Sequence, residues 1–140
     1  MNIMKGKETV KQWKFRSISP KMYNDCIFDL INVLPKDKYQ YVYGIPKGGV
    51  PVSIYICYQL QIEYLPILDP NLPKHKVLIA DDITDTGKTL LEYVNRGYDT
   101  AVLYYKSRSL IKPTYHIFDA SDYWIRFPYE KQDEIPNRGV

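Results

Sequence analysis

The chain has 140 residues, enough for one domain that buries a hydrophobic core without disulfides or a structural metal. Hydrophobic residues make up 45% of it, which excludes a disordered chain. Its 19 basic and 16 acidic residues give a net charge of +3, an excess too small to indicate a nucleic-acid binder but suited to a small anionic substrate. No apolar run approaches the roughly 20 residues that a membrane helix needs, so no membrane partner is expected.

The two cysteines, Cys26 and Cys57, have apolar neighbours and no CxxC or metal-ligand spacing. This pattern is typical of buried thiols in a reducing compartment. The N-terminal residues also lack the pattern of a secretory signal. We therefore expect a cytoplasmic protein whose thiols bind no metal.

The first third of the chain predicts an arm, a strand and a helix. Residues 1–10 are polar and are interpreted as an N-terminal arm, and the alternation of apolar side chains in residues 13–18 indicates a short strand. In residues 19–34 apolar side chains recur at steps of three and four, which predicts a helix. Ser19 is its expected N-cap and Pro35 its stop.

Strands and helices alternate through the middle of the chain. The predicted elements are, in order, a strand at 39–45, a helix at 50–60, a strand at 62–67, a strand at 76–80, a helix at 88–96 and a strand at 100–105. A loop at 68–75 and a polar turn at 81–87 flank the third of these strands. The alternation predicts an α/β fold, a mainly parallel twisted sheet flanked by helices, with ligands at the carboxyl ends of the strands.

The last part of the chain, residues 106–140, contains prolines and aromatic residues but no clear period. We interpret residues 106–130 as a small irregular hood over the sheet edge and residues 131–140 as a polar tail. Together with the rest, they predict a single domain.

The strongest chemical signal is VLIADDITDTGKTL at residues 77–90. A buried strand ends in two adjacent carboxylates, Asp81 and Asp82, and a turn rich in hydroxyl groups then opens a helix. Backbone N–H groups at a helix N-terminus favour a phosphate, whereas the carboxylates favour sugar hydroxyls or a magnesium ion. A Walker A loop requires glycine where Asp82 stands, which argues against a nucleoside triphosphatase. The alternative is a surface turn with a well-capped helix.

This segment resembles the phosphoribosyl pyrophosphate (PRPP) binding motif of the type I phosphoribosyltransferases, which is an apolar strand, two acidic residues, two further residues and DTGxT. The resemblance implies that Asp81 and Asp82 hold the ribose hydroxyls and Mg²⁺. It also implies that Asp85 is the acid–base residue that faces a purine base, although a simple helix N-cap is the alternative for Asp85. The residues implied in binding the 5′-phosphate are Asp85, Thr86, Gly87, Lys88 and Thr89.

A second turn, formed by Pro46, Lys47, Gly48 and Gly49, resembles the pyrophosphate loop of the same family. Glycines allow the backbone to approach an anion closely, and Lys47 supplies a positive charge. Many turns have this composition. Its value as a signal lies in its place, one helix and one strand before the acidic motif.

Lys106, Trp124 and Ile125 resemble the base-binding residues of the branch that uses xanthine, guanine and hypoxanthine. An ammonium group donates hydrogen bonds but cannot accept them, so Lys106 favours the 6-oxo group of such a purine over the amino group of adenine. Trp124 is then expected to stack on the base and Ile125 to present its backbone to the purine edge. The alternative for Trp124 is a structural side chain beneath an irregular lid.

One departure from the family pattern is the missing flap before the acidic strand, where only residues 68–75 stand. Another segment, such as residues 107–115, or a neighbouring subunit would have to shield the site. The resemblance implies a homodimeric enzyme of purine salvage that uses Mg²⁺ to transfer phosphoribose from PRPP to guanine, xanthine or hypoxanthine. The alternatives are a PRPP-sensing protein without catalysis and a transferase for another base, such as a pyrimidine.

Overall fold

The structure of the chain is a computed structural model that describes residues 2–5, 8–11, 14–121 and 123–131. Trp13, which begins the predicted first strand, and most of the predicted polar tail lie outside these ranges. The N-terminal arm carries two short antiparallel strands, β1 (Asn2–Lys5) and β2 (Glu8–Lys11).

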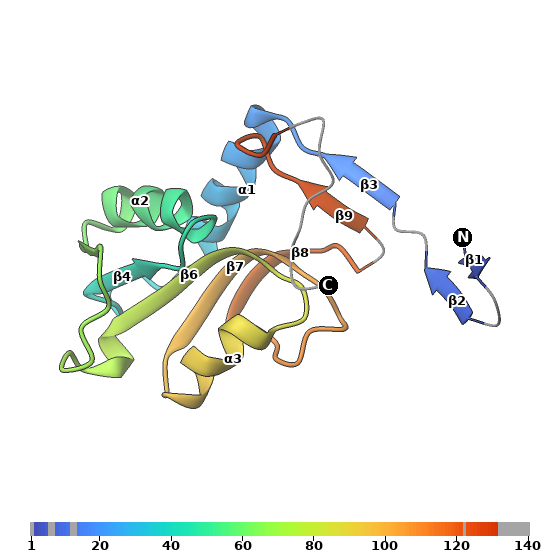
Figure 1. The fold of residues 1–140 in the computed structure, drawn as a ribbon. Coiled ribbons are helices and arrows are strands. Elements are labelled where there is room, and N and C mark those ends of the chain that lie inside the picture. The colour runs from blue at the N-terminus through green and yellow to red at the C-terminus, as the bar shows by residue number, and fades with distance from the viewer. Residues whose placement is uncertain (1, 6–7, 12–13, 122, 132–140) are drawn as a thin grey trace.

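The centre of the fold is a five-stranded sheet with the order β5-β4-β6-β7-β8, in which every neighbouring pair is parallel. This confirms the predicted α/β class (Figure 1). The strands are β4 (Tyr41–Gly44), β5 (Glu63–Leu65), β6 (Val77–Thr84), β7 (Asp99–Tyr105) and β8 (Tyr115–Asp119).

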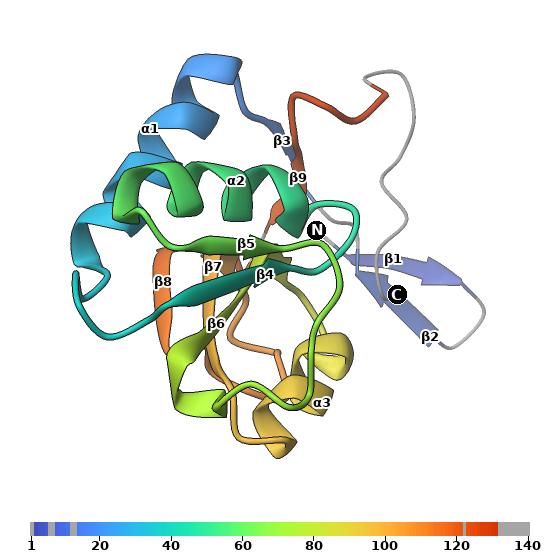
Figure 2. The same cartoon turned by 90° about the vertical axis from the view of Figure 1, so that its left-hand side faces the viewer.

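Helices cover both faces of this sheet. As Figure 2 shows, α1 (Pro20–Val33) and α2 (Gly49–Leu60) lie on one face and α3 (Lys88–Asn95) lies on the other. The side chains of β6 alternate between the two cores: Leu78 and Ala80 pack with α1 and α2, whereas Val77 and Ile79 pack on the side of α3. Burial on both faces explains why this strand is an uninterrupted apolar run in the sequence.

Local signals explain where the helices begin and end. The Ser19 hydroxyl accepts a hydrogen bond from the Met22 N–H at 3.1 Å, which caps α1 as predicted. Gly97 follows α3 with φ = +96°, a left-handed conformation that glycine adopts readily. A short 3₁₀ helix, Lys74–Lys76, ends the loop before β6. No helix in the described part of the chain is long and apolar enough to span a bilayer.

The predicted boundaries differ from the structure in two places. β6 continues to Thr84, four residues beyond the predicted end of the strand, because Ile83 and Thr84 pair with Tyr104 and Tyr105 of β7. The hood is also less irregular than predicted. It contributes β8 at the edge of the main sheet and β9 (Tyr123–Arg126), which pairs in parallel with β3 (Lys14–Ser17) beside the start of α1 (Figure 1).

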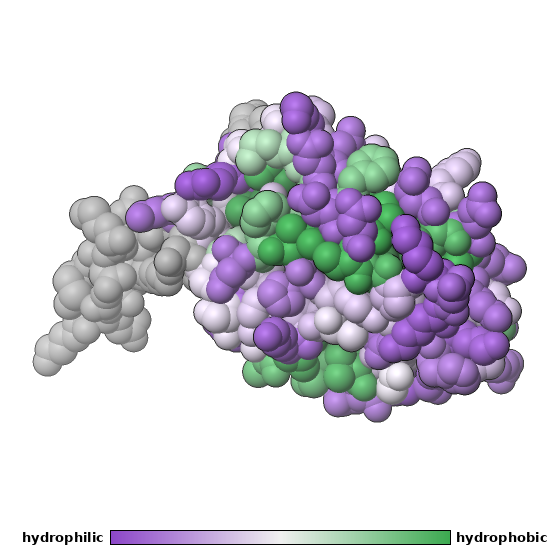
Figure 3. Space-filling model, turned by 180° about the vertical axis from the view of Figure 1, so that it is seen from behind, coloured by the Kyte–Doolittle hydropathy of each residue, from purple (hydrophilic) through white to green (hydrophobic). Residues whose placement is uncertain are grey.

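The surface is mixed. Seen from behind, hydrophobic residues form a band across the middle of the molecule between hydrophilic areas (Figure 3).

Cys26 is buried, and burial raises the pKa of its thiol to about 12, so it stays protonated at neutral pH. Cys57 is only partly buried, in contrast to the predicted buried pair, because it lies in the more exposed second half of α2.

Candidate active site

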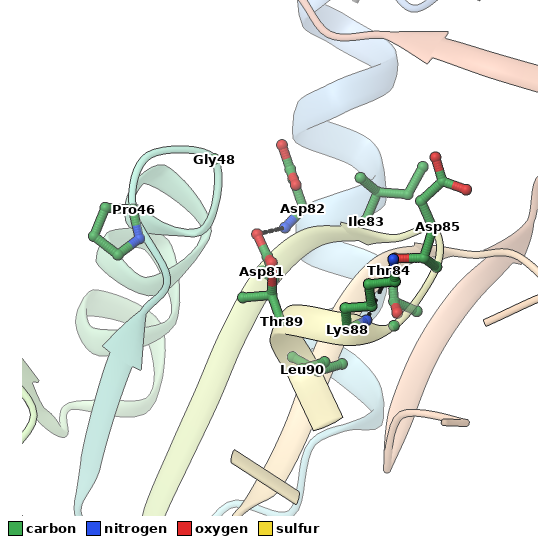
Figure 4. Close-up of a pocket in the computed structure, with 12 residues that line it drawn as sticks. Pro46, Gly48, Asp81, Asp82, Ile83, Thr84, Asp85, Lys88, Thr89 and Leu90 are labelled. Carbon is green, nitrogen blue, oxygen red and sulfur yellow. Dashed lines mark hydrogen bonds between the residues drawn. The ribbon is translucent and has the colours of Figure 1, made fainter. Parts of the chain in front are cut away.

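A cavity of about 360 Å³ opens at the carboxyl ends of β4 and β6, where the predicted motifs meet. Parallel α/β sheets place their ligand sites at this edge. The PKGG turn contributes to one side and the strand–turn–helix segment to the other (Figure 4). The lining residues are Pro46, Gly48 and every residue from 81 to 90.

The acidic pair lies in the second half of β6. Asp81 is partly exposed and its Oδ1 accepts a hydrogen bond from the Asp82 N–H at 2.8 Å. Asp82 is 4% exposed, and its Oδ2 accepts a hydrogen bond from the Tyr129 hydroxyl. Gly48 packs against the same carboxylate so closely that a Cβ at this position would overlap it. The two sides of the cavity therefore meet where Gly48 of the PKGG turn packs against Asp82 of the acidic pair.

Aromatic side chains from α1 and the hood cover the buried carboxylate of Asp82. The rings of Phe127 and Tyr129 stack with their centroids 5.5 Å apart, and the Tyr23 ring meets the Tyr129 ring edge-on at 5.8 Å. Burial and, next in size, the negative charge of Asp82 raise the pKa of Tyr23 above its ordinary value. The hood thus reaches the acidic pair directly.

The turn after β6 carries the predicted phosphate-binding residues. Gly87 has φ = +83°, and α3 begins at Lys88, so the positive end of the helix dipole lies at the cavity wall. The Lys88 N–H lies 3.4 Å from the Thr86 hydroxyl oxygen. This arrangement presents backbone N–H groups and hydroxyls to any anion that enters the cavity.

Two cations approach one oxygen of Asp85, a residue that is 7% exposed. The Arg108 guanidinium donates to Oδ1 through Nε at 2.7 Å and also through Nη2, and Lys106 Nζ lies 3.6 Å from the same oxygen. The other oxygen, Oδ2, is buried and accepts no hydrogen bond from any residue that the structure describes. Lys106 Nζ in turn lies 5.1 Å from the centre of the Trp124 ring. The predicted acid–base and base-binding residues are therefore neighbours.

Solved structures with the same architecture identify the fold. A purine phosphoribosyltransferase from Pyrococcus horikoshii superposes with a TM-score of 0.77 at 23% identity, covering 89% of this chain and 99% of that one. A xanthine-guanine-hypoxanthine phosphoribosyltransferase from Helicobacter pylori gives 0.68 at 16% identity, covering 81% and 91%. A hypothetical protein from Neisseria gonorrhoeae with bound ppGpp also gives 0.68, at 18% identity, covering 89% and 93%.

The chain has the type I phosphoribosyltransferase fold. The resemblance found in the sequence is thus confirmed at the level of the fold. Adenine phosphoribosyltransferases also match, with lower TM-scores, so these comparisons do not single out one base. No protein-family model and no curated protein matches the sequence.

Within the phosphoribosyltransferase fold, some predicted residues lie outside the cavity lining. Lys47 is exposed in the PKGG turn, and Gly49 is buried at the start of α2, where a Cβ would overlap the Ala80 carbonyl oxygen. Trp124 is 4% exposed in β9, and the Ile125 side chain belongs to the core. The structure therefore brings the acidic motif and the PKGG turn together in the cavity lining. Lys106 lies outside the lining but contacts Asp85, which belongs to it.

Sequence reasoning did not identify Arg108 or Tyr129. Arg108 stands two residues after Lys106 in a loop without periodicity, and its partner, Asp85, precedes it by 23 residues. Tyr129 is one of 14 tyrosines, and its contact with Asp82 spans 47 residues. For Arg108, the one signal in the sequence was its position two residues after Lys106, a predicted site residue. Nothing in the sequence distinguished Tyr129 from the other tyrosines.

Replacing Tyr129 by phenylalanine should lower the free energy of unfolding by about 1–3 kcal/mol, because the buried carboxylate of Asp82 loses a hydrogen-bond donor. Urea unfolding followed by circular dichroism measures this change. Tyr58→Phe is the matched control: Tyr58 is 76% exposed, and its substitution should stay within about 0.5 kcal/mol of the original protein. Equal stabilities of the two variants would show that the contact with Asp82 contributes nothing.

Proposed function

We propose that the chain is a phosphoribosyltransferase that moves the 5-phosphoribosyl group from PRPP to a 6-oxopurine and releases pyrophosphate. The observation that carries this proposal is one cavity lined by two carboxylates and a helix N-terminus, with a buried lysine next to its lining residue Asp85. The three features suit a sugar diol, a phosphate and an oxo group respectively. The fold that the chain shares with purine phosphoribosyltransferases supports the same reading.

PRPP would lie along the end of β6. Asp81 and Asp82 accept hydrogen bonds from the ribose hydroxyls, and the residues from Thr86 to Thr89 hold the 5′-phosphate with the positive end of α3. The PKGG turn lies on the same cavity, where its backbone can approach the pyrophosphate and Lys47 supplies charge. The Tyr129 hydroxyl donates a hydrogen bond to Asp82, as a ribose hydroxyl would.

Magnesium is the proposed cofactor, and the acidic pair fits it. Mg²⁺ is usually held by one or two carboxylates together with substrate phosphates, rather than by a cage of protein ligands. Asp81 and Asp82 are such a pair, and the described residues include no group of three or more His, Cys, Asp or Glu that could hold a metal alone. A bound ion would neutralise charge on the departing pyrophosphate.

The base would lie beside Asp85, Lys106 and Trp124. The Lys106 ammonium donates to the 6-oxo group, and the Asp85 carboxylate accepts the proton that the purine loses as the glycosidic bond forms. The Trp124 ring supplies a face for stacking. Because this ring is 4% exposed, side chains that cover it must move before a base can stack on it.

Incubating the protein with PRPP, Mg²⁺ and one base at a time tests the proposal. The bases are guanine, hypoxanthine, xanthine, adenine, uracil and orotate, and the products measured are nucleotide and pyrophosphate. Product from the 6-oxopurines alone, lost when EDTA removes the magnesium, supports the proposal. Product from adenine or a pyrimidine would support the transferase activity but contradict the assignment of a 6-oxopurine as its substrate.

A second candidate function is PRPP sensing without catalysis. It is favoured by the short connection between β5 and β6, which offers only residues 66–76 where a long flap would be needed to exclude water. Calorimetry separates the two functions, since PRPP that binds tightly but yields no product with any base would favour the sensor. The homodimer, the cytoplasmic location and a place in purine salvage stay predictions.

A further inference from the structure

The Arg108 side chain stands behind Asp85 rather than in the cavity. It lies in the loop that joins β7 to β8 and does not line the cavity, and its side chain is 37% exposed whereas that of Asp85 is 6% exposed. Two of its nitrogens donate to the same oxygen, Oδ1. Figure 4 shows the Asp85 side chain pointing away from Lys88 and Thr89, the predicted phosphate-binding residues.

We infer that Arg108 is a positioning residue that fixes the carboxylate of Asp85 so that Oδ2 accepts the proton of the base. The inference rests on the proposed function of Asp85. Rotation about the last side-chain bond of an aspartate is only weakly restricted, so a lone carboxylate would sample many orientations. Two donors from one planar guanidinium, both on Oδ1, select one orientation, in which Oδ2 accepts no hydrogen bond from the part of the chain that the structure describes.

The loop that carries Arg108 is fixed to the segment that carries Asp85. The Lys106 N–H donates to the Thr84 carbonyl at 3.1 Å, and the Leu110 N–H donates to the Thr86 carbonyl at 2.7 Å. The Thr84 and Ser109 hydroxyls are 2.9 Å apart. These contacts lie on both sides of Asp85 and of Arg108, so the geometry of the ion pair is set before any ligand arrives. Holding a catalytic group in place before the ligand binds should increase the reaction rate more than it increases ligand affinity.

Steady-state kinetics of three variants test the inference. Arg108→Gln should lower kcat by about 10- to 100-fold and leave the KM for PRPP within about twofold, since an interaction that acts only in the transition state is removed. Arg108→Lys keeps one charged donor and should recover part of the lost kcat. Lys112→Gln, an exposed residue of the same loop, is the matched control and should match the original protein. Thermal melting checks that each variant is folded.

Two kinetic outcomes would overturn the inference. An unchanged kcat in Arg108→Gln would show that Asp85 does not depend on Arg108. A KM for PRPP that rises as much as kcat falls would instead make Arg108 a ligand contact. If the unaltered protein gave no product with any base, the proposed function would fail. Crystal structures of the unaltered protein and of Arg108→Gln would then test separately whether Arg108 positions Asp85. An Asp85 carboxylate that keeps its orientation in Arg108→Gln contradicts the positioning role, and a reoriented one supports it.

Discussion

Replacing Asp85 by asparagine should lower kcat by about 10²- to 10⁴-fold, the range over which positioned acid–base groups act, and change PRPP binding less. The carboxylate lies beside Lys106, and its buried oxygen Oδ2 accepts no hydrogen bond from the described residues, so it is placed to accept a proton from a base. An asparagine of the same shape cannot accept that proton. Kinetics with the most active base, together with calorimetry of PRPP binding, measure the two effects separately.

The control for Asp85→Asn must also remove an ion-paired aspartate. Asp99→Asn does so: Asp99 lies 3.2 Å from Lys38 Nζ and accepts a hydrogen bond from the Tyr39 hydroxyl at 2.6 Å, at the amino end of β7 and away from the cavity. Its kcat should equal that of the original protein. The assigned role of Asp85 is wrong if Asp85→Asn weakens PRPP binding and leaves turnover intact.

Gly87→Ala should weaken PRPP binding by tenfold or more, about 1.4 kcal/mol, because the turn proposed to hold the phosphate cannot keep its shape. Gly87 has φ = +83°, and a Cβ there would overlap the Ser109 hydroxyl and stand 2.7 Å from the Leu110 nitrogen. The loop from Lys106 to Leu110 would have to move away from the turn. Calorimetry with PRPP measures the loss of binding.

Gly97→Ala separates this clash from the strain of a left-handed residue. Gly97 also has a positive φ, +96°, but the nearest atom to its added Cβ is Lys74 Cδ at 3.6 Å, an ordinary contact. The Gly97→Ala substitution should lower the free energy of unfolding by about 1–2 kcal/mol, through backbone strain alone, and leave PRPP binding unchanged. If the two alanine variants bound PRPP equally well, packing between the turn and the loop would have no part in the site.

The elements that the sequence predicted correctly are those with strong local signals. The helix capped by Ser19 and the acidic strand–turn–helix segment depend on residues close together in the chain. β8 and β9 were missed because both are short and depend on pairing for their stability: β8 adds to the edge of the sheet beside β7, and β9 pairs with β3 from the other end of the chain. The end of β6 was misplaced because polar residues there are held by pairing with β7.

The candidate site also contains a local part that the sequence predicted and long-range contacts that it did not. The residues of the acidic motif meet in one cavity, because a strand and the turn after it place neighbouring residues side by side. The contacts of Asp85 with Arg108 and of Asp82 with Tyr129 bridge 23 and 47 residues. Such pairs depend on how loops return over the sheet, and neither spacing nor composition specifies that path.

The acidic side and the aromatic side of the candidate site differ in how firmly the backbone holds them. β6, which carries the acidic pair, is hydrogen-bonded to β4 on one side and β7 on the other, whereas β9, which carries Trp124, pairs among the described strands only with β3. Local opening therefore frees the aromatic side, which belongs to a two-stranded sheet, before it frees the acidic side in the middle of the five-stranded sheet. A sugar phosphate bound as proposed would meet a nearly rigid surface, and the heterocycle would meet one that can adapt to it.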